Sequence, residues 1–267
     1  MHSFATFAVE KNCRSFYPLI FNFIFNFEKS KMPKGKLFLI PNVLAENTAQ
    51  HIISPQIKEV ISNTKVYLVE NLRTARRYIS SLKLEVNIEE LHMEILDKDT
   101  APETINRLMQ PLLNGADVGV ISEAGCPGIA DPGALAVAHA HLKGIQVVPL
   151  SGPSSMFMAL MASGFSGQSF AFHGYLPIDK KEKTAALRKL ETESTREKRA
   201  QIFMETPFRN NQLLEDILST LAPQTKLCIA KNLTASDEMV LTKTVDEWKK
   251  LPIDLHKIPT VFIIQSF

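Results

Sequence analysis

The chain has 267 residues, of which 45% are hydrophobic and 22% are charged, and these fractions exclude a disordered, collagen-like or coiled-coil protein. Thirty Lys and Arg residues against 28 Asp and Glu residues give a net charge of +2. No strong overall field therefore indicates a polyanionic partner, which would need a local basic patch. Three cysteines without metal-ligand spacing argue against a disulfide framework and a zinc site. We expect a cytoplasmic protein without a bound metal.

The first residues differ in composition from the rest of the chain. The apolar run 16–27 is interrupted by Asn22 and Asn26, and it is shorter than the roughly 20 apolar residues that span a bilayer. A secretory signal is an alternative interpretation, but no small-residue cleavage site follows the run. Met32 directly precedes the first strand-like segment. We therefore expect translation to begin at Met32, residues 1–33 to be a non-native or disordered extension, and no association with a membrane.

From residue 34 onward, short apolar runs alternate with amphipathic segments, a pattern typical of α/β folds with largely parallel sheets. The first series of predicted strands is 37–40, 65–69, 118–122 and 146–149, with helices at 49–61, 72–81, 101–113 and 134–141. The second series has strands at 170–172, 200–204, 226–230 and 260–264, with helices at 180–193, 211–220 and 245–249. We predict an α/β fold with two α/β domains, 34–150 and 169–267, and a cofactor cleft between them. A linker, 151–168, contains a connecting helix at 156–161.

The segment 122–133, SEAGCPGIADPG, is the most informative part of the sequence. It follows a predicted strand directly, and its glycines and prolines exclude helix and strand. Open α/β sheets bind ligands at the carboxyl ends of their strands, and glycine lets a ligand approach the backbone closely. The segment is longer than an ordinary turn requires. We interpret it as a ligand-binding loop, and the absence of Walker and Gly-x-Gly-x-x-Gly motifs argues against phosphate-loop and dinucleotide-binding enzymes.

A second loop, Pro149-Leu150-Ser151-Gly152-Pro153-Ser154-Ser155, follows another predicted strand. Its two final serines are placed to cap the next helix, which is a purely structural role for at least one of them. Alternatively, the Gly-Pro pair turns the backbone sharply and leaves both hydroxyls facing a cavity. Both interpretations remain open from the sequence.

The two loops together resemble those of the tetrapyrrole methylases, a superfamily of S-adenosylmethionine-dependent methyltransferases. Within it they are most similar to the branch that methylates the ribose 2′-hydroxyl of a cytidine in small-subunit ribosomal RNA. Three later segments in matching order extend the resemblance over nearly all of residues 36–267: Phe172-His173-Gly174-Tyr175-Leu176-Pro177, Glu205-Thr206-Pro207-Phe208-Arg209, and Ala230-Lys231-Asn232-Leu233-Thr234 with Glu238. The family pattern for these segments is Phe-x-Gly-Phe-Leu-Pro, Glu-Ser/Thr-Pro-x-Arg, and Ala-Arg-Glu-Leu-Thr with a following Glu.

This sequence departs from the family pattern mainly in its first loop and in two carboxylates. The usual Thr-Pro-Ile-Gly-Asn-Leu is Ile40-Pro41-Asn42-Val43-Leu44-Ala45 and lacks its glycine. The Glu-Asp-Thr-Arg element is Glu70-Asn71-Leu72-Arg73, and the Glu of Ala-Arg-Glu-Leu-Thr is Asn232. The usual Gly-Glu before the last strand is also missing. These departures bear on the identity of the substrate more than on use of the cofactor.

The resemblance implies a set of site residues, with S-adenosylmethionine as cofactor and S-adenosylhomocysteine as product. The expected cofactor-binding residues are Pro41, Glu123, Ala124, Gly125, Cys126, Ser154, Ser155, Met204 and Ala230. A ribose hydroxyl is a poor nucleophile and needs a base or strong positioning, and the candidate acids are Glu70, Glu205 and Glu238, with Glu123 and Asp131 also considered. The expected substrate-binding residues are Arg73, Arg209, Lys180, Lys181 and Lys183, the three lysines lying in the basic segment 180–199.

The expected partners are ribosomal RNA or the small ribosomal subunit, together with a second copy of the chain in a homodimer. An alternative keeps the fold and cofactor but places a porphyrin or corrin precursor in the cleft as a substrate for C-methylation. A more distant alternative is a catalytically silent protein that only binds S-adenosylmethionine. The basic segment 180–199 favours RNA.

Overall fold

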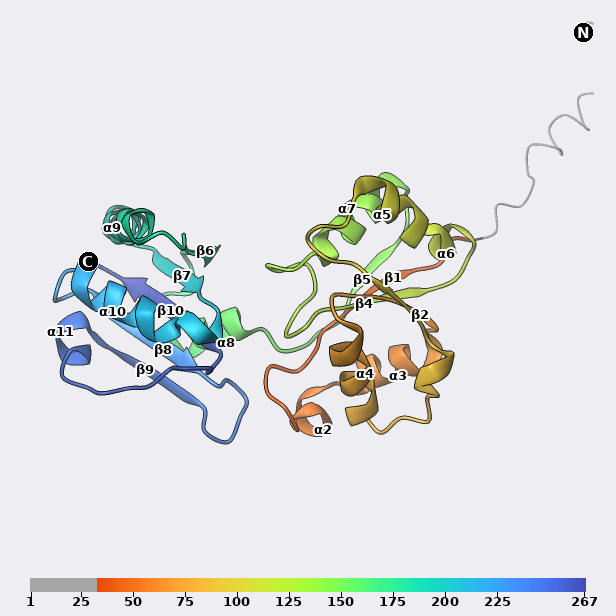
Figure 1. Ribbon diagram of the computed structural model, residues 1–267, viewed down its shortest axis with the longest axis horizontal. Helices are drawn as coiled ribbons and strands as arrows, with labels where there is room; N and C mark the ends of the chain where they lie inside the picture. Colours follow the sequence, from red (N-terminus) through yellow and green to blue (C-terminus); the bar gives the residue numbers. More distant parts are fainter. Residues whose placement is uncertain (1–32) are drawn as a thin grey trace, which may run out of the picture.

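The computed structural model describes residues 33–267, so the predicted N-terminal extension, 1–33, falls almost entirely outside the described residues. Figure 1 shows two lobes joined by a single crossing of the chain, each built on its own five-stranded sheet. The predicted fold class, an α/β fold built of two α/β units, is confirmed. No helix among residues 33–267 is long and apolar enough to cross a membrane.

The first sheet is entirely parallel, in the order β3-β2-β4-β1-β5. Its strands are β1 (Leu37–Ile40), β2 (Val66–Val69), β3 (His92–Ile95), β4 (Val118–Ile121) and β5 (Val147–Pro149). Helices α2 (Ala49–Ile52), α3 (Pro55–Asn63) and α4 (Leu72–Ser81) pack on one face, and α5 (Pro102–Leu108), α6 (Gln110–Leu113) and α7 (Gly133–Leu142) pack on the other. Because helices cover both faces of the sheet, both sides of each central strand are buried, and this explains why these strands have uninterrupted apolar sequences.

Two of the helices predicted in this unit are divided in the structure. The predicted helix 49–61 breaks at Ser54, whose side chain caps α3, with Pro55 at its first position. The predicted helix 101–113 breaks before Pro111, which lies in the first turn of α6. Proline has no N–H to donate. It is therefore well suited to the first turn of a helix, where that N–H would have no partner, but it breaks a helix when it lies in the interior.

The second sheet is mixed, in the order β6-β7-β10-β8-β9, so the expectation of a largely parallel sheet is wrong here. Only the pair β6 (Phe170–Tyr175) and β7 (Ala200–Met204) is parallel. The remaining strands are β8 (Lys226–Lys231), β9 (Met239–Thr244) and β10 (Thr260–Gln265), and the pairs β7–β10, β10–β8 and β8–β9 are all antiparallel. Strands β8 and β9 are joined by a short loop that contains no helix, and such a connection allows only antiparallel pairing.

Helices cover both faces of this second sheet. Helices α9 (Lys180–Glu197), α10 (Asn210–Thr220) and α11 (Val245–Trp248) share one apolar core with it. Helix α8 (Ser155–Ser163) packs on the opposite face through Met156, Ala159 and Leu160. The helix predicted in the linker is therefore part of the second unit by its packing.

Candidate functional site

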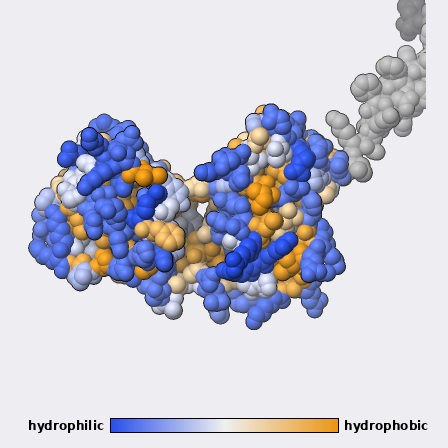
Figure 2. Space-filling view, in the orientation of Figure 1, coloured by the Kyte–Doolittle hydropathy of each residue, from blue (hydrophilic) through white to orange (hydrophobic). Residues whose placement is uncertain are grey.

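A cavity of about 410 Å³ lies at the carboxyl edge of the first sheet, between the two lobes (Figure 2). The first unit contributes Glu70 after β2, the loop that follows β4, and the serines after β5. Parallel strands end at a common edge, so residues far apart in the sequence meet there. The second unit closes the cavity with Phe172, Tyr175, Met204, Glu205, Pro207, Ala230, Leu233, Pro259, Thr260 and Val261.

Asn42, a residue that sequence reasoning missed, holds the loop after β4 in place. Its backbone pairs with Gly125 in an isolated antiparallel bridge, with N···O distances of 2.9 and 3.2 Å. Its side-chain amide donates to the carbonyl oxygens of Ser122 and Glu123, both at 3.0 Å. Gly125 has a φ of +69°, in the left-handed region that favours glycine. The signal available in the sequence is a polar residue two positions after the apolar first strand.

Asp131 organises the second half of this loop. Its Oδ1 accepts hydrogen bonds from the backbone N–H groups of Gly128 at 2.9 Å and Gly133 at 2.6 Å. A Cβ on Gly133 would lie 2.6 Å from that oxygen, so close packing favours glycine at this position. The other oxygen, Oδ2, is buried and has no hydrogen-bond partner within residues 33–267. One oxygen of Asp131 is therefore used by the fold, and the other is free for a proton or a ligand.

Glu70 and Asp131 form a carboxyl pair in the wall of the cavity. Burial, first, and the facing carboxylate of Asp131 with its charge together raise the pKa of Glu70 to about 8. The backbone N–H of Glu123 donates to Glu70 Oε1 at 3.3 Å. A proton on Glu70 supplies the donor that two facing carboxylates otherwise lack. The pair therefore holds a proton near neutral pH.

The raised pKa of Glu70 predicts how stability varies with pH. Between its ordinary value and about 8, the folded chain keeps a proton that the unfolded chain has lost, so stability falls as pH rises through this range. Glu70→Gln keeps a donor toward Asp131 but cannot titrate. Between pH 5 and pH 9, the wild type should lose about 1 kcal/mol more stability than Glu70→Gln, or roughly 2–4 °C more in Tm. The effect is limited to this size because the Glu70 side chain is partly open to solvent. Thermal melts of both proteins at these two pH values measure it, and equal losses would contradict the assignment.

The structure brings most of the predicted cofactor-binding residues together. Eight of the nine line the cavity: Glu123, Ala124, Gly125, Cys126, Ser154, Ser155, Met204 and Ala230. Ser154 is at the N-cap position of α8 but makes no capping hydrogen bond through its side chain. Burial raises the pKa of Cys126, so this thiol is a poor nucleophile.

Pro41 is the exception and does not line the cavity. A Cβ on Gly152 would lie 2.3 Å from the Pro41 Cβ, so the two loops pack tightly against each other there. The Pro41 carbonyl oxygen accepts a hydrogen bond from the Tyr78 hydroxyl at 2.8 Å. Pro41 therefore supports the second loop from behind.

Two of the three candidate catalytic acids are already engaged. Glu205 lines the cavity, but its Oε1 accepts from Arg209 Nη2 and from the backbone N–H of Thr206, both at 2.6 Å. Glu238 is outside the cavity wall and accepts from the backbone N–H of Thr234 at 2.6 Å. The structure thus leaves Glu70 as the candidate for moving a proton.

The predicted substrate-binding residues are divided by the fold. Lys180 and Lys181 are exposed at the start of α9, and Arg73 is exposed in the first turn of α4, which Asn71 caps in place of the usual carboxylate. The prediction for Lys183 is wrong, because its ammonium group is buried and lies 3.0 Å from Asp216 Oδ2. Asp216 belongs to α10, so the Lys183 side chain lies on the side of α9 that packs against α10 and not on the side that faces solvent.

The charge of the cavity wall is one-sided. Four carboxyl residues line it, Glu70, Glu123, Asp131 and Glu205, and none of the described lining residues is Lys, Arg or His. With Glu205 paired to Arg209 and a proton on Glu70, the wall still carries a net negative charge from the remaining carboxylates. Such a wall disfavours phosphate-bearing cofactors and favours a ligand with positive charge. The volume is within the range of about 300–1,000 Å³ that is common for small-molecule sites.

Comparison with known proteins agrees with this geometry. Residues 47–249 match the family of Tetrapyrrole (Corrin/Porphyrin) Methylases. The chain is 31% identical over 72% of its length to the ribosomal RNA small subunit methyltransferase I of Xylella fastidiosa, covering 67% of that protein. For the protein of the same name from Mycobacterium tuberculosis, the identity is 31% over 81% of this chain and 72% of the relative.

Solved structures share the fold at low sequence identity. The methyltransferase CobJ superposes with a TM-score of 0.59 at 16% identity, over 87% of this chain and 94% of that one. The cobalt precorrin-4 methyltransferase CbiF gives a TM-score of 0.54 at 14% identity, over 86% of this chain and 94% of that one. Together with the matched residues and the cavity between the lobes, these findings show that the chain belongs to the tetrapyrrole methylase family and is similar, within it, to the ribosomal RNA small subunit methyltransferases I.

Proposed function

We propose that this chain transfers a methyl group from S-adenosylmethionine to the ribose 2′-hydroxyl of a cytidine in small-subunit ribosomal RNA. The observation that carries the proposal is the acidic cavity between the lobes, whose wall suits a cationic donor. The names of the relatives, ribosomal RNA small subunit methyltransferase I, support RNA as the acceptor. The proposal includes action in the cytoplasm, as a homodimer, on ribosomal RNA or the small ribosomal subunit.

The residues present fit S-adenosylmethionine, which supplies, when bound, an electrophilic methyl group on a sulfonium. The backbone around Gly125 and the hydroxyls of Ser154 and Ser155 would bind its polar groups, and the apolar side chains of Met204 and Ala230 would contact its adenosine. Glu123 and Asp131 would favour its positive charges. Asn42 takes part only indirectly, by fixing the backbone of the loop.

Glu70 is the residue to which we assign the proton of the acceptor hydroxyl. As methyl transfer proceeds, the O–H bond of the ribose breaks, and its proton passes to the Glu70 carboxylate, which shares it with Asp131. The raised pKa of about 8 makes this carboxylate a stronger base than an ordinary glutamate, although a protonated pair must first ionise. Positive charge bound in the cavity favours that ionised form.

The proposal is tested by mapping 2′-O-methyl groups in ribosomal RNA from cells with and without the gene. We expect a single cytidine in the small-subunit RNA to lose its methyl group in cells without the gene and to regain it when wild-type protein is supplied. Complementation with Glu70→Gln should restore little of it. If no nucleotide differs while S-adenosylhomocysteine still binds, RNA is not the substrate, and spectral changes on adding a tetrapyrrole would favour the porphyrin or corrin alternative.

Charge reversal at the start of α9 is expected to weaken binding of RNA. The exposed residues Lys180 and Lys181 are the relevant pair, so Lys180→Glu with Lys181→Glu should lower the affinity for small-subunit RNA roughly 10-fold or more at low salt, with a reduced dependence on salt. Binding of S-adenosylhomocysteine should not change. The matched control is Lys36→Glu with Lys65→Glu, two exposed lysines at the amino ends of β1 and β2, away from the cavity. Equal losses in both double variants would mean that α9 has no specific role.

A further inference from the structure

Phe208 is an exposed aromatic side chain at the rim of the cavity. It lies in the short helix η2 (Pro207–Arg209), and its neighbour Pro207 lines the cavity wall. The side chain is 68% exposed, although a phenylalanine gains free energy when it is buried. A scattered apolar residue on the surface needs no explanation by itself, so its meaning depends on its surroundings.

The surroundings of Phe208 fix the position of its ring. The imidazole of His256 meets it edge-on, with centroids 6.2 Å apart and an interplanar angle of 76°. The ammonium of Lys257 lies 5.9 Å from the ring centroid. The two loops are tied together, since the backbone N–H of Lys257 donates to the Pro207 carbonyl oxygen at 2.9 Å. The ring is therefore a positioned surface beside the cavity with an exposed face.

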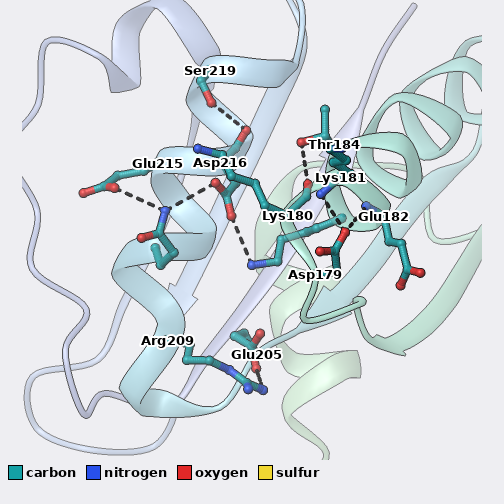
Figure 3. A network of polar contacts seen from close by, with 12 residues as sticks. Asp179, Lys180, Lys181, Glu182, Thr184, Glu205, Arg209, Glu215, Asp216 and Ser219 are labelled. Carbon is teal, nitrogen blue, oxygen red and sulfur yellow. Dashed lines mark hydrogen bonds and ion pairs between the residues drawn. The ribbon is translucent and has the colours of Figure 1, made fainter.

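Positive charge accompanies this aromatic surface. The Arg209 guanidinium is anchored by Nη2 to the buried Glu205 carboxylate at 2.6 Å, and its side chain remains 39% exposed (Figure 3). Its Nε is buried and has no partner within residues 33–267. The carboxylate of Asp254, on the loop before His256, accepts hydrogen bonds from the Asn211 side-chain amide at 2.8 Å and from the His256 backbone N–H at 2.9 Å. Lys257 therefore has no ion pair among residues 33–267, and Arg209, although paired with Glu205, keeps a partly exposed side chain toward an anion from outside.

We propose that Phe208, Lys257 and Arg209 form a binding site for the nucleotide next to the methylated one, with the base stacked on the Phe208 ring and its phosphate near the two cations. An aromatic face binds any base by stacking, while Arg and Lys contact the phosphate, and this combination is typical of single-stranded nucleic-acid binding. The site complements the acidic interior of the cavity, which would repel phosphate. This inference rests on the proposed function, because it assumes an RNA acceptor.

The test compares RNA binding by Phe208→Leu, Phe208→Trp and Lys257→Gln in the full chain. The probes are a labelled single-stranded oligoribonucleotide and small ribosomal subunits from cells lacking the gene, titrated at several salt concentrations. Stacking contributes about 1–3 kcal/mol per base, so Phe208→Leu should weaken binding roughly 5-fold to 150-fold with an unchanged salt dependence. Phe208→Trp should restore it. Lys257→Gln should weaken binding and lower the salt dependence by about one phosphate contact. S-adenosylhomocysteine should bind all three variants equally.

The outcomes separate this inference from the proposed function. If wild-type protein binds RNA and Phe208→Leu binds it equally well, the stacking site is refuted while the RNA function stands. If Phe208→Leu and Phe208→Trp are weakened alike, a positioned ring is not what matters, and the inference again fails. If wild-type protein does not bind either RNA but gives a spectral change with uroporphyrin that Phe208→Leu abolishes, both the RNA function and this inference are overturned.

Discussion

Gly125→Val is expected to abolish calorimetrically detectable binding of S-adenosylhomocysteine. Wild-type protein should bind this ligand at one site per chain with a Kd in the micromolar range, which corresponds to a binding free energy of about −8 kcal/mol. Gly125 has a φ of +69°, which a β-branched residue rarely adopts. A bare Cβ would fit, 3.4 Å from Leu44 Cδ2 and 3.6 Å from the Pro153 carbonyl oxygen. Because Gly125 lines the cavity, we expect the γ-methyl groups of valine to take up space that the ligand needs, and relief of the strain would break the bridge to Asn42. We expect a loss of at least about 100-fold.

Gly164 provides the matched control for that experiment. It has a similar φ of +75°, but a Cβ there would meet nothing within 4 Å, and the residue lies at the end of α8, outside the cavity wall. Gly164→Val therefore imposes comparable backbone strain without filling the cavity. It should bind S-adenosylhomocysteine like the wild type, with a somewhat lower Tm. Wild-type affinity in Gly125→Val would refute the position assigned to the ligand.

Lys183→Met is expected to destabilise the chain by about 3–5 kcal/mol, which corresponds to a fall in Tm of roughly 6–20 °C. The side chains of Lys183 and Asp216 are 6% and 7% exposed, and their Nζ and Oδ2 atoms are 3.0 Å apart. Removing the ammonium leaves a buried carboxylate that keeps a side-chain hydrogen bond from Gln212 Nε2, 3.3 Å from Oδ1. Thermal and urea unfolding of both proteins measure the effect.

Two further variants identify the cause of that loss. Lys183→Met with Asp216→Leu removes both charges and should recover most of the stability, because apolar side chains of similar size can replace a buried ion pair. Lys180→Met, on the exposed side of the same helix, should change the free energy of unfolding by less than about 0.5 kcal/mol. Were the double variant as unstable as Lys183→Met, lost packing would be the cause instead of an uncompensated charge.

One edge strand of each sheet was beyond what the sequence could predict, whereas the opposite edge strands, β5 and β6, were predicted. Strand β3, with the sequence HMEI, and strand β9, MVLTKT, are edge strands that are only partly buried, so they lack the unbroken apolar character of the central strands. Each is recognisable only from the backbone of the neighbour with which it pairs, β2 and β8 respectively. The mixed strand direction of the second sheet was also not predictable from local sequence. It is set by β10, which pairs with both β7 and β8, although these segments are far apart in the sequence.

The sequence by itself determined the central strands, the fold class and the two loops that border the cavity, because apolar runs, glycines and prolines act on the backbone locally. The tertiary structure alone decided how individual polar side chains are used. It pairs Glu70 with Asp131, engages Glu205 with Arg209 and buries Lys183 against Asp216. A carboxylate or an ammonium looks the same in a sequence whether it is solvated, paired or free. Its burial and its partner, which set its pKa and its chemistry, are established only when distant segments meet.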